Sequence, residues 1–427
     1  MTAGGTTVLV VGAGSPGKRR VYERLVELGA RLVIADEPGH WSTSLAQEAI
    51  ADRCLAAPVT GDPDVDAQAI LAAVEAAGAR PTGVFTIWED SVTVAARVAA
   101  ALGLPGNPPQ AVDAARSKLR TRETAARLGL PSPRAHRVRS LDELYAAAAD
   151  IGFPAVVKPE FGALAMGCVR VDDVESLPNV YRFVRDIVRP EIDGIFRAGN
   201  DLLLEQYLDG PEFDVDVVLE AGRCLFYSVS QELPVPEPVF QAQGMFLPPS
   251  HSRRAVGGLV DLSVRMALAF GFVTGVLHIE GKCTSAGPRV IEINARLGGG
   301  KVPELVDAVW GVDLIEAQLR SALGMPQQLE GSRRPRCGVV YHLVQPPRSG
   351  RLAALNFRDV DAGGPLGVLL EVHSHIGDDV LGPESTTATW VAELAVSGRN
   401  VRQARAVADE VLRDALVVEP GPVAEGV

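Results

Sequence analysis

The sequence predicts an α/β protein built from more than one domain. Its amino-terminal part alternates short apolar runs with amphipathic helical segments, the pattern of a parallel sheet covered by helices. Further along, apolar runs come in pairs separated by turn residues, which indicates antiparallel hairpins in α+β lobes. The chain has 427 residues, of which 47% are hydrophobic, so it is long enough to bury two or three separate cores.

The composition argues against several classes of protein. There are 53 acidic and 41 basic residues, giving a formal charge of -12, so nucleic acid is not an expected partner. No apolar stretch approaches the roughly 20 residues that span a bilayer, so no membrane partner is expected. The five cysteines are far apart and lack any C-x-x-C spacing. They predict neither a disulfide framework nor a zinc site, and they favour a cytoplasmic protein.

The first α/β domain is expected over residues 1–112. Residues 7–36 have the pattern of a strand, a helix and a second strand, and the helix and strand signals continue to a proline-rich turn at 104–109. The stretch "WEDS" at 88–91 follows the end of an expected strand, where α/β sheets place ligand contacts. We therefore expect Glu89 to bind the amino group of a substrate.

The first turn of this domain, "GAGSPGKRR", contains two phosphate-binding patterns. The G-x-x-x-x-G-K pattern ends at Lys18, but Arg19 stands where a P-loop needs a hydroxyl for magnesium, which disfavours that interpretation. The G-x-G-x-x-G pattern of a dinucleotide site stays open, since Asp36 ends the second strand about twenty residues on. In that case the protein is an NAD-dependent oxidoreductase that uses Gly12, Gly14 and Gly17. Otherwise the turn and Lys18 or Arg19 hold a substrate carboxylate.

A second unit is expected over residues 113–330, with a smaller lobe at about 132–206 and a larger lobe at about 207–330. Ser140 and Glu143 form a capping box for a helix at 141–153. The proline-rich segment 232–249 is expected to be a long functional loop. The other expected elements are helices at 111–130, 177–192, 255–271 and 302–324, strands at 154–171 and 201–208, and hairpins at 213–230 and 275–296.

The third unit, residues 331–427, is expected to be a small carboxy-terminal α+β lobe. It has short strand signals, proline and glycine turns, and a final helix at 401–416. His373 and His375 are spaced to share one face of a strand. No third metal ligand follows them, so we interpret both as structural.

The hairpin "HIEGKCTSAGPRVIEIN" carries the most chemical information. If its turn centres near Ala286, Glu280 lies opposite Glu292 and His278 lies opposite Asn294. All four side chains then share one face of the sheet, and Ile279, Ile291 and Ile293 take the other face.

Like charges directly opposite one another destabilise a sheet, so the two glutamates of this hairpin need a cation between them. Their oxygens, with that of the asparagine, favour magnesium, which usually completes its coordination with water and substrate phosphates. The hairpin therefore predicts a nucleotide. The alternative is an edge hairpin with both glutamates in water. Arg296 follows the second strand and is either a surface residue or placed to stabilise negative charge near the metal.

Three segments of the chain resemble the ATP-grasp ligases. These are "VVKPEFGALAMG", "LLLEQYLDGPEFDVDVV" and "HIEGKCTSAGPRVIEINARLGGG", which occur in the order and spacing of that family. Within the family the chain most resembles the amino-acid (dipeptide) ligases, the branch that includes carnosine synthase. The resemblance covers essentially the whole chain. It implies a Rossmann-like pre-ATP-grasp domain, a two-lobed ATP-grasp fold and a carboxy-terminal lobe.

The resemblance also implies an ATP site and its residues. Lys118 and Lys158 match the lysines that hold the phosphates, and the loop from Gly162 to Gly167 matches a flexible glycine-rich lid. Family members often have serines in this lid, whereas this chain has "GALAMG", so backbone N–H groups would hold the phosphate. The implied ATP-binding residues near the phosphates are Lys118, Lys158, Gly162, Met166 and Gly167. Those of the adenine hinge are Glu205, Gln206, Tyr207 and Leu208, and Glu212 is implied to contact the ribose.

Metal, catalytic and substrate residues are implied in the same way. Glu280, Glu292 and Asn294 match the ligands of magnesium, two ions of which are expected, with Mn²⁺ able to substitute. Asp214 and Asp216 are expected only on the exposed face of a strand. The implied catalytic residues are Arg296, Lys158 and His278, and the implied substrate residues are Glu89, Lys18, Gly299, Gly300 and Lys301.

The implied reaction joins an amino acid, or a related carboxylate, to the amine of an amino acid or peptide. The γ-phosphoryl group of ATP moves to the carboxylate, and the amine attacks the acyl phosphate to give an amide, ADP and phosphate. The expected partners are small-molecule substrates and a second copy in a homodimer. An ATP-grasp ligase or carboxylase of nucleotide metabolism is the first alternative, and the NAD-dependent oxidoreductase is the second.

Overall fold

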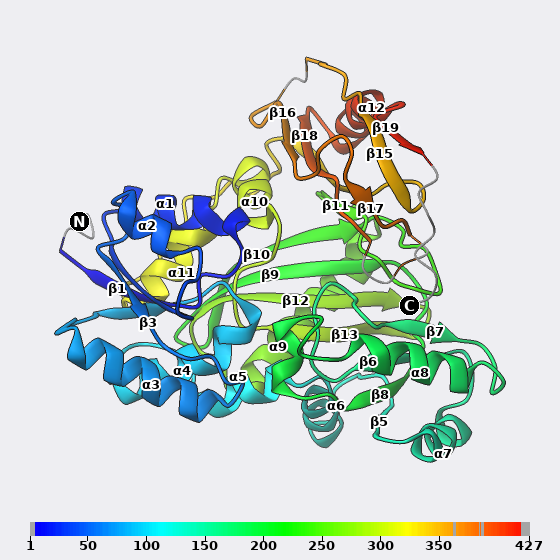
Figure 1. Ribbon diagram of the computed structural model, residues 1–427, viewed down its shortest axis with the longest axis horizontal. Helices are drawn as coiled ribbons and strands as arrows, with labels where there is room; N and C mark the ends of the chain where they lie inside the picture. Colours follow the sequence, from blue (N-terminus) through cyan, green and yellow to red (C-terminus); the bar gives the residue numbers. More distant parts are fainter. Residues whose placement is uncertain (1–4, 362–363, 384, 386–387, 420–427) are drawn as a thin grey trace.

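The computed structural model describes residues 5–361, 364–383, 385 and 388–419. Within these residues the strands form four sheets, and the mixed α/β class is confirmed. Figure 1 shows the largest sheet in the middle, the amino-terminal domain at the left and a smaller sheet with its helices at the lower right. No helix in the described part of the chain is long and apolar enough to span a bilayer.

The amino-terminal domain is a parallel four-stranded sheet in the order β3-β2-β1-β4. After Thr7, its first strand is apolar because both faces are covered: Val8 and Val10 pack in one core cluster, and Leu9 and Val11 in another. Its elements are β1 (Thr7–Val11), η1 (Pro16–Lys18), α1 (Arg19–Glu27), β2 (Arg31–Asp36), α2 (Thr43–Gln47), β3 (Arg53–Ala56), α3 (Pro63–Ala76), β4 (Gly83–Phe85), η2 (Glu89–Ser91) and α4 (Val92–Ala101).

The single helix predicted at 111–130 is wrong, because two helices occupy this stretch. They are α5 (Pro109–Arg116) and α6 (Lys118–Arg127). Ser117 between them has an extended backbone, and its hydroxyl accepts a hydrogen bond from the Arg120 N–H at 3.1 Å, which caps α6. This break matters for the site because it places Arg116 and Lys118 at a turn rather than on the side of one long helix.

The smaller lobe is a four-stranded antiparallel sheet in the order β5-β8-β6-β7. The helix predicted after Ser140 is present, and the Ser140 hydroxyl accepts from the Glu143 N–H at 3.1 Å. The elements are β5 (Ala135–Val138), α7 (Leu141–Ile151), β6 (Ala155–Pro159), β7 (Val169–Val171), α8 (Leu177–Ile187), η3 (Gly194–Ala198) and β8 (Leu202–Gln206).

The central sheet has eight strands in the order β13-β12-β9-β10-β11-β14-β18-β16, so strands from beyond residue 330 continue the sheet of the larger lobe. One of its strands, β11, lies in the segment 232–249, so the prediction of a loop throughout that segment is wrong. Its strands are β9 (Glu212–Glu220), β10 (Arg223–Glu232), β11 (Gly244–Leu247), β12 (Gly275–Thr284), β13 (Gly287–Asn294), β14 (Gly338–Val344), β16 (Val368–Val372) and β18 (Ala392–Gly398).

Helices and a small third sheet complete the molecule. The helix predicted at 302–324 is two helices, because the chain turns at Gly311 with a φ of 71°. The final helix stops at Leu412, before a strand. His373 and His375 follow β16, so the prediction that they share a strand is wrong. The elements are α9 (Arg253–Phe270), α10 (Val302–Trp310), α11 (Leu314–Ala322), α12 (Val401–Leu412) and a sheet of β17 (Asp379–Val380), β15 (Gly350–Leu355) and β19 (Leu416–Glu419).

Candidate active site

Strands β12 and β13 bring the predicted carboxylates together. Glu280 pairs with Glu292 and His278 pairs with Asn294, as expected. The route to this register differs from the prediction, because Thr284 pairs with Gly287 and the turn is therefore centred before Ala286. A bulge between Glu280 and Gly281 restores the expected pairing.

The bulge displaces one of the three isoleucines expected on the apolar face. Ile291 is the extra residue and has no partner in the ladder, and it is only partly buried. Ile279 and Ile293 pair with each other and are fully buried, as expected. The two glutamates therefore face each other, but Ile291 does not occupy a regular position on the apolar face.

Strand β9 adds two more acids to the same polar face. Asp214 pairs with Glu280 and Asp216 pairs with His278. Both aspartates are buried, with relative exposures of 3% and 1%, so the prediction of an exposed face is wrong. The aspartates and valines do alternate between the two faces of β9. The valine face packs in the apolar core, and the aspartate face meets a buried polar site instead of water.

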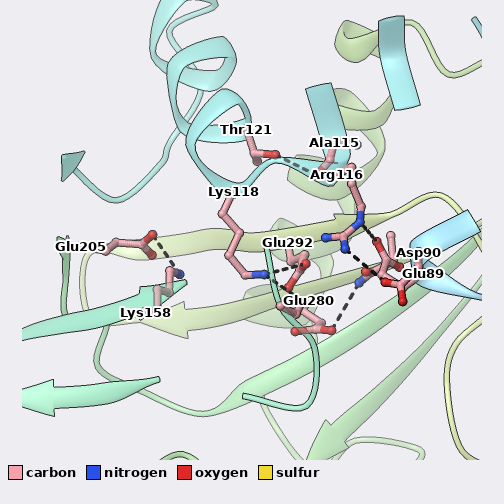
Figure 2. Close-up of polar contacts among 12 residues, drawn as sticks. Glu89, Asp90, Ala115, Arg116, Lys118, Thr121, Lys158, Glu205, Glu280 and Glu292 are labelled. Atoms are coloured by element: carbon pink, nitrogen blue, oxygen red, sulfur yellow. Dashed lines mark hydrogen bonds and ion pairs between the residues drawn. The ribbon is translucent and has the colours of Figure 1, made fainter. Parts of the chain in front are cut away.

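The facing glutamates have opposite electrostatic surroundings. Burial and the Glu292 carboxylate raise the pKa of Glu280 to about 8, and the Asn294 amide donates to its Oε1 at 3.3 Å. Burial opposes ionisation of Glu292 as well, but Lys118, and after it Arg116 and Lys158, outweigh burial and hold its pKa below the usual value. The Lys118 Nζ lies 3.0 Å from the Glu292 Oε1 (Figure 2).

The donor set fits a hard divalent cation. Two facing carboxylates and the amide oxygen of Asn294 are the oxygen ligands that magnesium prefers, and a cation between the carboxylates would offset the repulsion that raises the pKa of Glu280. Among the described residues no three His, Cys, Asp or Glu side chains form a ready metal cluster. The set therefore suits an ion that takes its remaining ligands from water and phosphate.

His278 lies deep in the same face. Its Nδ1 is 2.8 Å from the Asp216 Oδ1. Burial disfavours the charged imidazolium, but the Asp216 carboxylate outweighs burial and raises the pKa of His278 to about 9. The imidazole is thus an oriented, positively charged group at neutral pH.

Lys158 is anchored from β6. Its Nζ lies 2.9 Å from the Glu205 Oε2, and Arg122 meets both oxygens of the same carboxylate at 3.1 Å. Burial would raise the pKa of Glu205, but Arg122 and Lys158 outweigh burial and lower it. Figure 2 shows that this pair and the Lys118–Glu292 pair lie in a row. Glu205 therefore acts here through its side chain, as a counter-ion for Lys158.

The segment between β6 and β7 contains the predicted lid residues Gly162, Met166 and Gly167. The Gly162 carbonyl accepts a hydrogen bond from the Lys118 Nζ at 3.2 Å. Leu164 and Ala165 have φ values of 57° and 55°, in the left-handed region that such residues rarely adopt. The segment therefore lies over the two lysines with a strained backbone.

The predicted hinge, Glu205 to Leu208, begins in the last two residues of β8 and continues beyond the strand. The Leu208 carbonyl faces the Lys282 Nζ at 3.4 Å, and the Tyr207 hydroxyl donates to Glu237 at 2.8 Å. Lys282 also faces Glu212 at 3.7 Å, and burial raises the pKa of Glu212. Leu208 and Glu212 thus share Lys282 as a neighbour.

Arg296 and Glu89 meet across the boundary between two domains. The Arg296 Nε donates to the Glu89 Oε2 at 2.6 Å, and its Nη1 donates to the Leu297 carbonyl at 2.8 Å. The other Glu89 oxygen faces the Arg116 Nε at 3.3 Å. Both oxygens of Glu89 therefore face arginines, so a substrate amine would have to share this carboxylate with them.

The remaining predicted substrate residues lie beside Arg296. Lys18, Gly300 and Lys301 line one small pocket, and Gly299 is exposed in the same loop. Burial and the nearby Arg296 lower the pKa of Lys18. The turn at 12–18 therefore faces the reaction centre, as its interpretation as a carboxylate site requires.

Three residues of the carboxy-terminal segment lie next to the loop that holds Gly300 and Lys301, and no sequence pattern predicted them. The Tyr341 hydroxyl donates to Glu393 at 2.5 Å, and the Lys301 Nζ pairs with Glu371 at 2.6 Å. A Cβ at Gly300, where φ is 51°, would lie 2.7 Å from the Tyr341 hydroxyl. These side chains reach the loop at Gly300 because β14, β18 and β16 continue the central sheet beyond β11.

The glycine turn of the amino-terminal domain does not offer an open dinucleotide groove. A Cβ at Gly14 would lie 2.2 Å from the Trp88 ring, so the turn packs directly against that side chain. Asp36, the expected ribose ligand, instead accepts from the Ala13 N–H at 2.7 Å and pairs with His40 at 3.1 Å. The glycines serve close packing, and the geometry disfavours the oxidoreductase.

Known families match both parts of this arrangement. Residues 151–304 match the ATP-grasp domain, and residues 22–106 match the ATP-grasp N-terminal domain. The chain belongs to the ATP-grasp family. The first match contains the lid segment, the hinge and all three predicted metal ligands of this ATP-grasp protein.

Individual relatives point to one branch of the ATP-grasp family. The chain is 34% identical to carnosine synthase 1 of Gallus gallus over 78% of its own length, but it spans only 37% of that relative. It is 24% identical to an L-arginine-specific L-amino acid ligase of Bacillus subtilis, over 55% of each chain. The crystal structure of an L-amino acid ligase from Bacillus licheniformis superposes with a TM-score of 0.81 at 21% identity, covering 98% of this chain and 99% of that one.

Proposed function

We propose that this ATP-grasp protein is an ATP-dependent carboxylate–amine ligase that joins an amino acid, or a related carboxylate, to the amine of an amino acid or peptide. The observation that carries the proposal is the buried face on which Glu280 meets Glu292, with Lys118 and Lys158 along one side and Arg296 at its end. The carnosine synthase and amino acid ligase relatives support this reaction over the other ATP-grasp activities.

Glu280, Glu292 and Asn294 would hold the magnesium ions, of which we propose two, with Mn²⁺ as a substitute. When bound, the metal neutralises the phosphate oxygens and orients them for transfer. Lys118 and Lys158 would bind the ATP phosphates, and their carboxylate partners position them for this. We further propose that the segment holding Gly162, Met166 and Gly167 closes over the phosphates, that Glu205, Gln206, Tyr207 and Leu208 form the adenine site, and that Glu212 binds the ribose.

In the first step, a carboxylate oxygen of the substrate attacks the γ-phosphorus and the bond to the ADP oxygen breaks. The amine then attacks the acyl carbon, the carbon–oxygen bond to phosphate breaks, and the amine loses a proton. Arg296 would stabilise the negative oxygen of the tetrahedral intermediate, and the charged His278 would add to the positive potential there. Closure of the lid would exclude water, which otherwise hydrolyses the acyl phosphate.

The substrates would bind between the domains. Lys18 and Lys301 supply cations for a carboxylate, and Gly299 and Gly300 let a ligand approach the backbone. Glu89 would attract a substrate amine only in competition with its two arginines. All five cysteines are free thiols, in keeping with a cytoplasmic location, and we propose a homodimer, which light scattering would test.

The test is magnesium-dependent phosphate release from ATP across amino acids offered singly and in pairs, with mass spectrometry of the products. We expect release to require a pair and to accompany a product lighter than the sum of the pair by one water. Binding of NAD with no release for any pair would contradict the proposal. Release with bicarbonate and a ribonucleotide amine in place of the pair would favour the carboxylase alternative.

A further inference from the structure

Arg116 is a buried cation at the edge of the reaction centre whose donors are mostly unused. It ends α5, and its side chain is 5% exposed. Within the described residues, neither Nη1 nor Nη2 has a hydrogen-bond acceptor, and solvent reaches neither atom. The nearest carboxylate atoms are the Glu89 Oε1, 3.3 Å from Nε, and the Asp90 Oδ1, 3.5 Å from Nη2 (Figure 2).

These distances show ion pairing without full hydrogen bonding. Charge-assisted N–H···O bonds are normally about 2.7–2.9 Å long, and a guanidinium has five N–H donors to satisfy. The Asp90 Oδ1 also has no hydrogen bond within the described chain, and burial raises the pKa of Asp90 to about 6. Leaving a buried polar group unpaired costs its full desolvation energy, so the arrangement favours an additional acceptor.

Arg116 is tied to the reaction centre through Glu89. One oxygen of this carboxylate faces Arg116 and the other binds Arg296, so the two guanidinium groups flank one side chain. Arg116 also lowers the pKa of Glu292, which shows that its charge acts on the metal face. The phosphate lysines lie further along the same row, with Lys158 at the far side beside Glu205 (Figure 2).

The aromatic ring that packs on the Arg116 guanidinium belongs to the residue next to the proposed lid segment. The Phe161 ring lies 5.4 Å from the Arg116 Cζ, in cation–π contact, and Phe161 directly precedes Gly162. Leu164 and Ala165 hold the same segment in left-handed conformations, which are strained for residues with a side chain. Movement of this segment would therefore uncover the guanidinium on the side of the phosphate lysines.

We propose that Arg116 is a catalytic residue that binds the carboxylate substrate through its two Nη groups and presents one carboxylate oxygen to the γ-phosphorus. This inference rests on the ligase function proposed above. A planar carboxylate matches the two parallel donors of a guanidinium, whereas Lys118 and Lys158 already supply cations for the ATP phosphates. Phe161 leaves the guanidinium when the carboxylate enters and covers it again when the acyl phosphate has formed.

The test compares Arg116→Gln and Arg116→Lys with Arg120→Gln, a control at an exposed arginine on α6. The first measurement is the KM for the acyl donor identified by the pair screen, at saturating ATP and amine. We expect Arg116→Gln to raise this KM at least tenfold and to change the KM for ATP less than twofold. Arg116→Lys keeps the charge beside Glu89 and Asp90 but lacks the fork, so we expect an intermediate KM.

A second measurement needs no turnover. The ¹⁹F line width of trifluoroacetate, a minimal carboxylate, is followed on addition of protein with magnesium and a non-hydrolysable ATP analogue. We expect Arg116→Gln to lose at least half of the broadening that the wild type and Arg120→Gln produce. The melting temperature of each variant shows whether it is folded.

Three outcomes would overturn the role of Arg116. They are an unchanged acyl-donor KM in a folded Arg116→Gln variant, a raised KM for ATP alone, and a lowered melting temperature with unchanged trifluoroacetate broadening. Failure of the ligase proposal is distinguishable, because the wild type would then release no phosphate with any pair. In that case the trifluoroacetate measurement alone decides whether Arg116 binds carboxylates.

Discussion

The half of the site that we assign to the nucleotide comes from one stretch of the chain, whereas the half that we assign to the substrates takes side chains from three separate stretches. Lys118, Lys158 and the facing glutamates all lie between residues 113 and 330. The substrate half combines Lys18 and Glu89 of the amino-terminal domain with Arg296 and Lys301, and with acids from β16 and β18.

The two halves also differ in which of their cations lack a partner. In the nucleotide half, Lys118 pairs with Glu292, and Lys158 shares Glu205 with Arg122, although the Arg122 Nη1 and the Asp216 Oδ2 are buried without a hydrogen bond among the described residues. In the substrate half, Arg296 and Lys301 are paired, but both Nη atoms of Arg116 are buried without an acceptor in the described part of the chain. Substitutions in the first half should therefore lower kcat for every substrate, and those in the second should change KM for particular substrates.

The largest effect is expected for Glu292→Gln. The variant keeps the shape of the side chain but removes a charged ligand of the proposed magnesium site and the ionic partner of Lys118, so kcat should fall about 100-fold or more for all substrate pairs. Steady-state phosphate release checks this, with the exposed Glu175→Gln as control. Full activity in Glu292→Gln would remove the basis for the ligase and leave the nucleotide half without its assigned role.

The next largest effect is expected for Glu89→Gln, at the point where the halves meet. The neutral amide would hold Arg296 and Arg116 less firmly, and loss of such a positioning partner commonly costs about 10- to 100-fold. Because Arg296 would then stabilise the second step poorly, some acyl phosphate should be hydrolysed. The ratio of amide formed to phosphate released should fall below one, and a ratio of one with unchanged kcat would show that Glu89 does not position Arg296.

The facing glutamates of the nucleotide half could be predicted from sequence because they lie in one hairpin, whereas Lys118 and Lys158 were implied by the family resemblance. Strand alternation is a local rule, and it placed Glu280 opposite Glu292. The predicted turn centre was wrong, but the bulge between Glu280 and Gly281 restored the predicted pairing. Counting residues from the turn could not predict this bulge. The burial of Asp214 and Asp216 was missed because alternation cannot say whether the polar face meets water or another buried charge.

The substrate half could be predicted only in part. Lys18 was expected from the glycine-rich turn at 12–18, and Lys301 was implied by the family resemblance. Tyr341 and Glu393 could not be predicted. Their sequences resemble short strands of a separate lobe, and their positions depend on pairing between strands that are far apart in the sequence. Arg116 was hidden for another reason: the break at Ser117 is a single serine within a strongly helical stretch.

A smaller effect, confined to one substrate, is expected for Gly300→Ala. The new methyl group would lie 2.7 Å from the Tyr341 hydroxyl, and the φ of 51° disfavours any side chain. We expect a loss of stability of about 1 kcal/mol and a several-fold higher KM for the amine. Adding Tyr341→Phe removes the hydroxyl contact but keeps the ring atoms at 3.2 Å, so the double variant should recover part of both losses. If the amine KM is unchanged in Gly300→Ala, this loop does not line the amine site.

The smallest effect is expected for the ion pair between Lys301 and Glu371. The two side chains are 15% and 41% exposed, so water and salt screen much of their attraction. A double-mutant cycle with Lys301→Met and Glu371→Gln should give a coupling of about 0.5 kcal/mol in stability, falling as salt is added.

The same cycle, measured on substrate KM, separates two roles for Lys301. If Lys301 binds a substrate carboxylate, Glu371→Gln should free the ammonium and leave KM unchanged or lower, while Lys301→Met should raise it. Equal effects of both single variants would mean that the pair only fastens β16 to the loop. The substrate half would then rely on Lys18 and the arginines for its positive charge, and its boundary would lie inside the amino-terminal and catalytic domains.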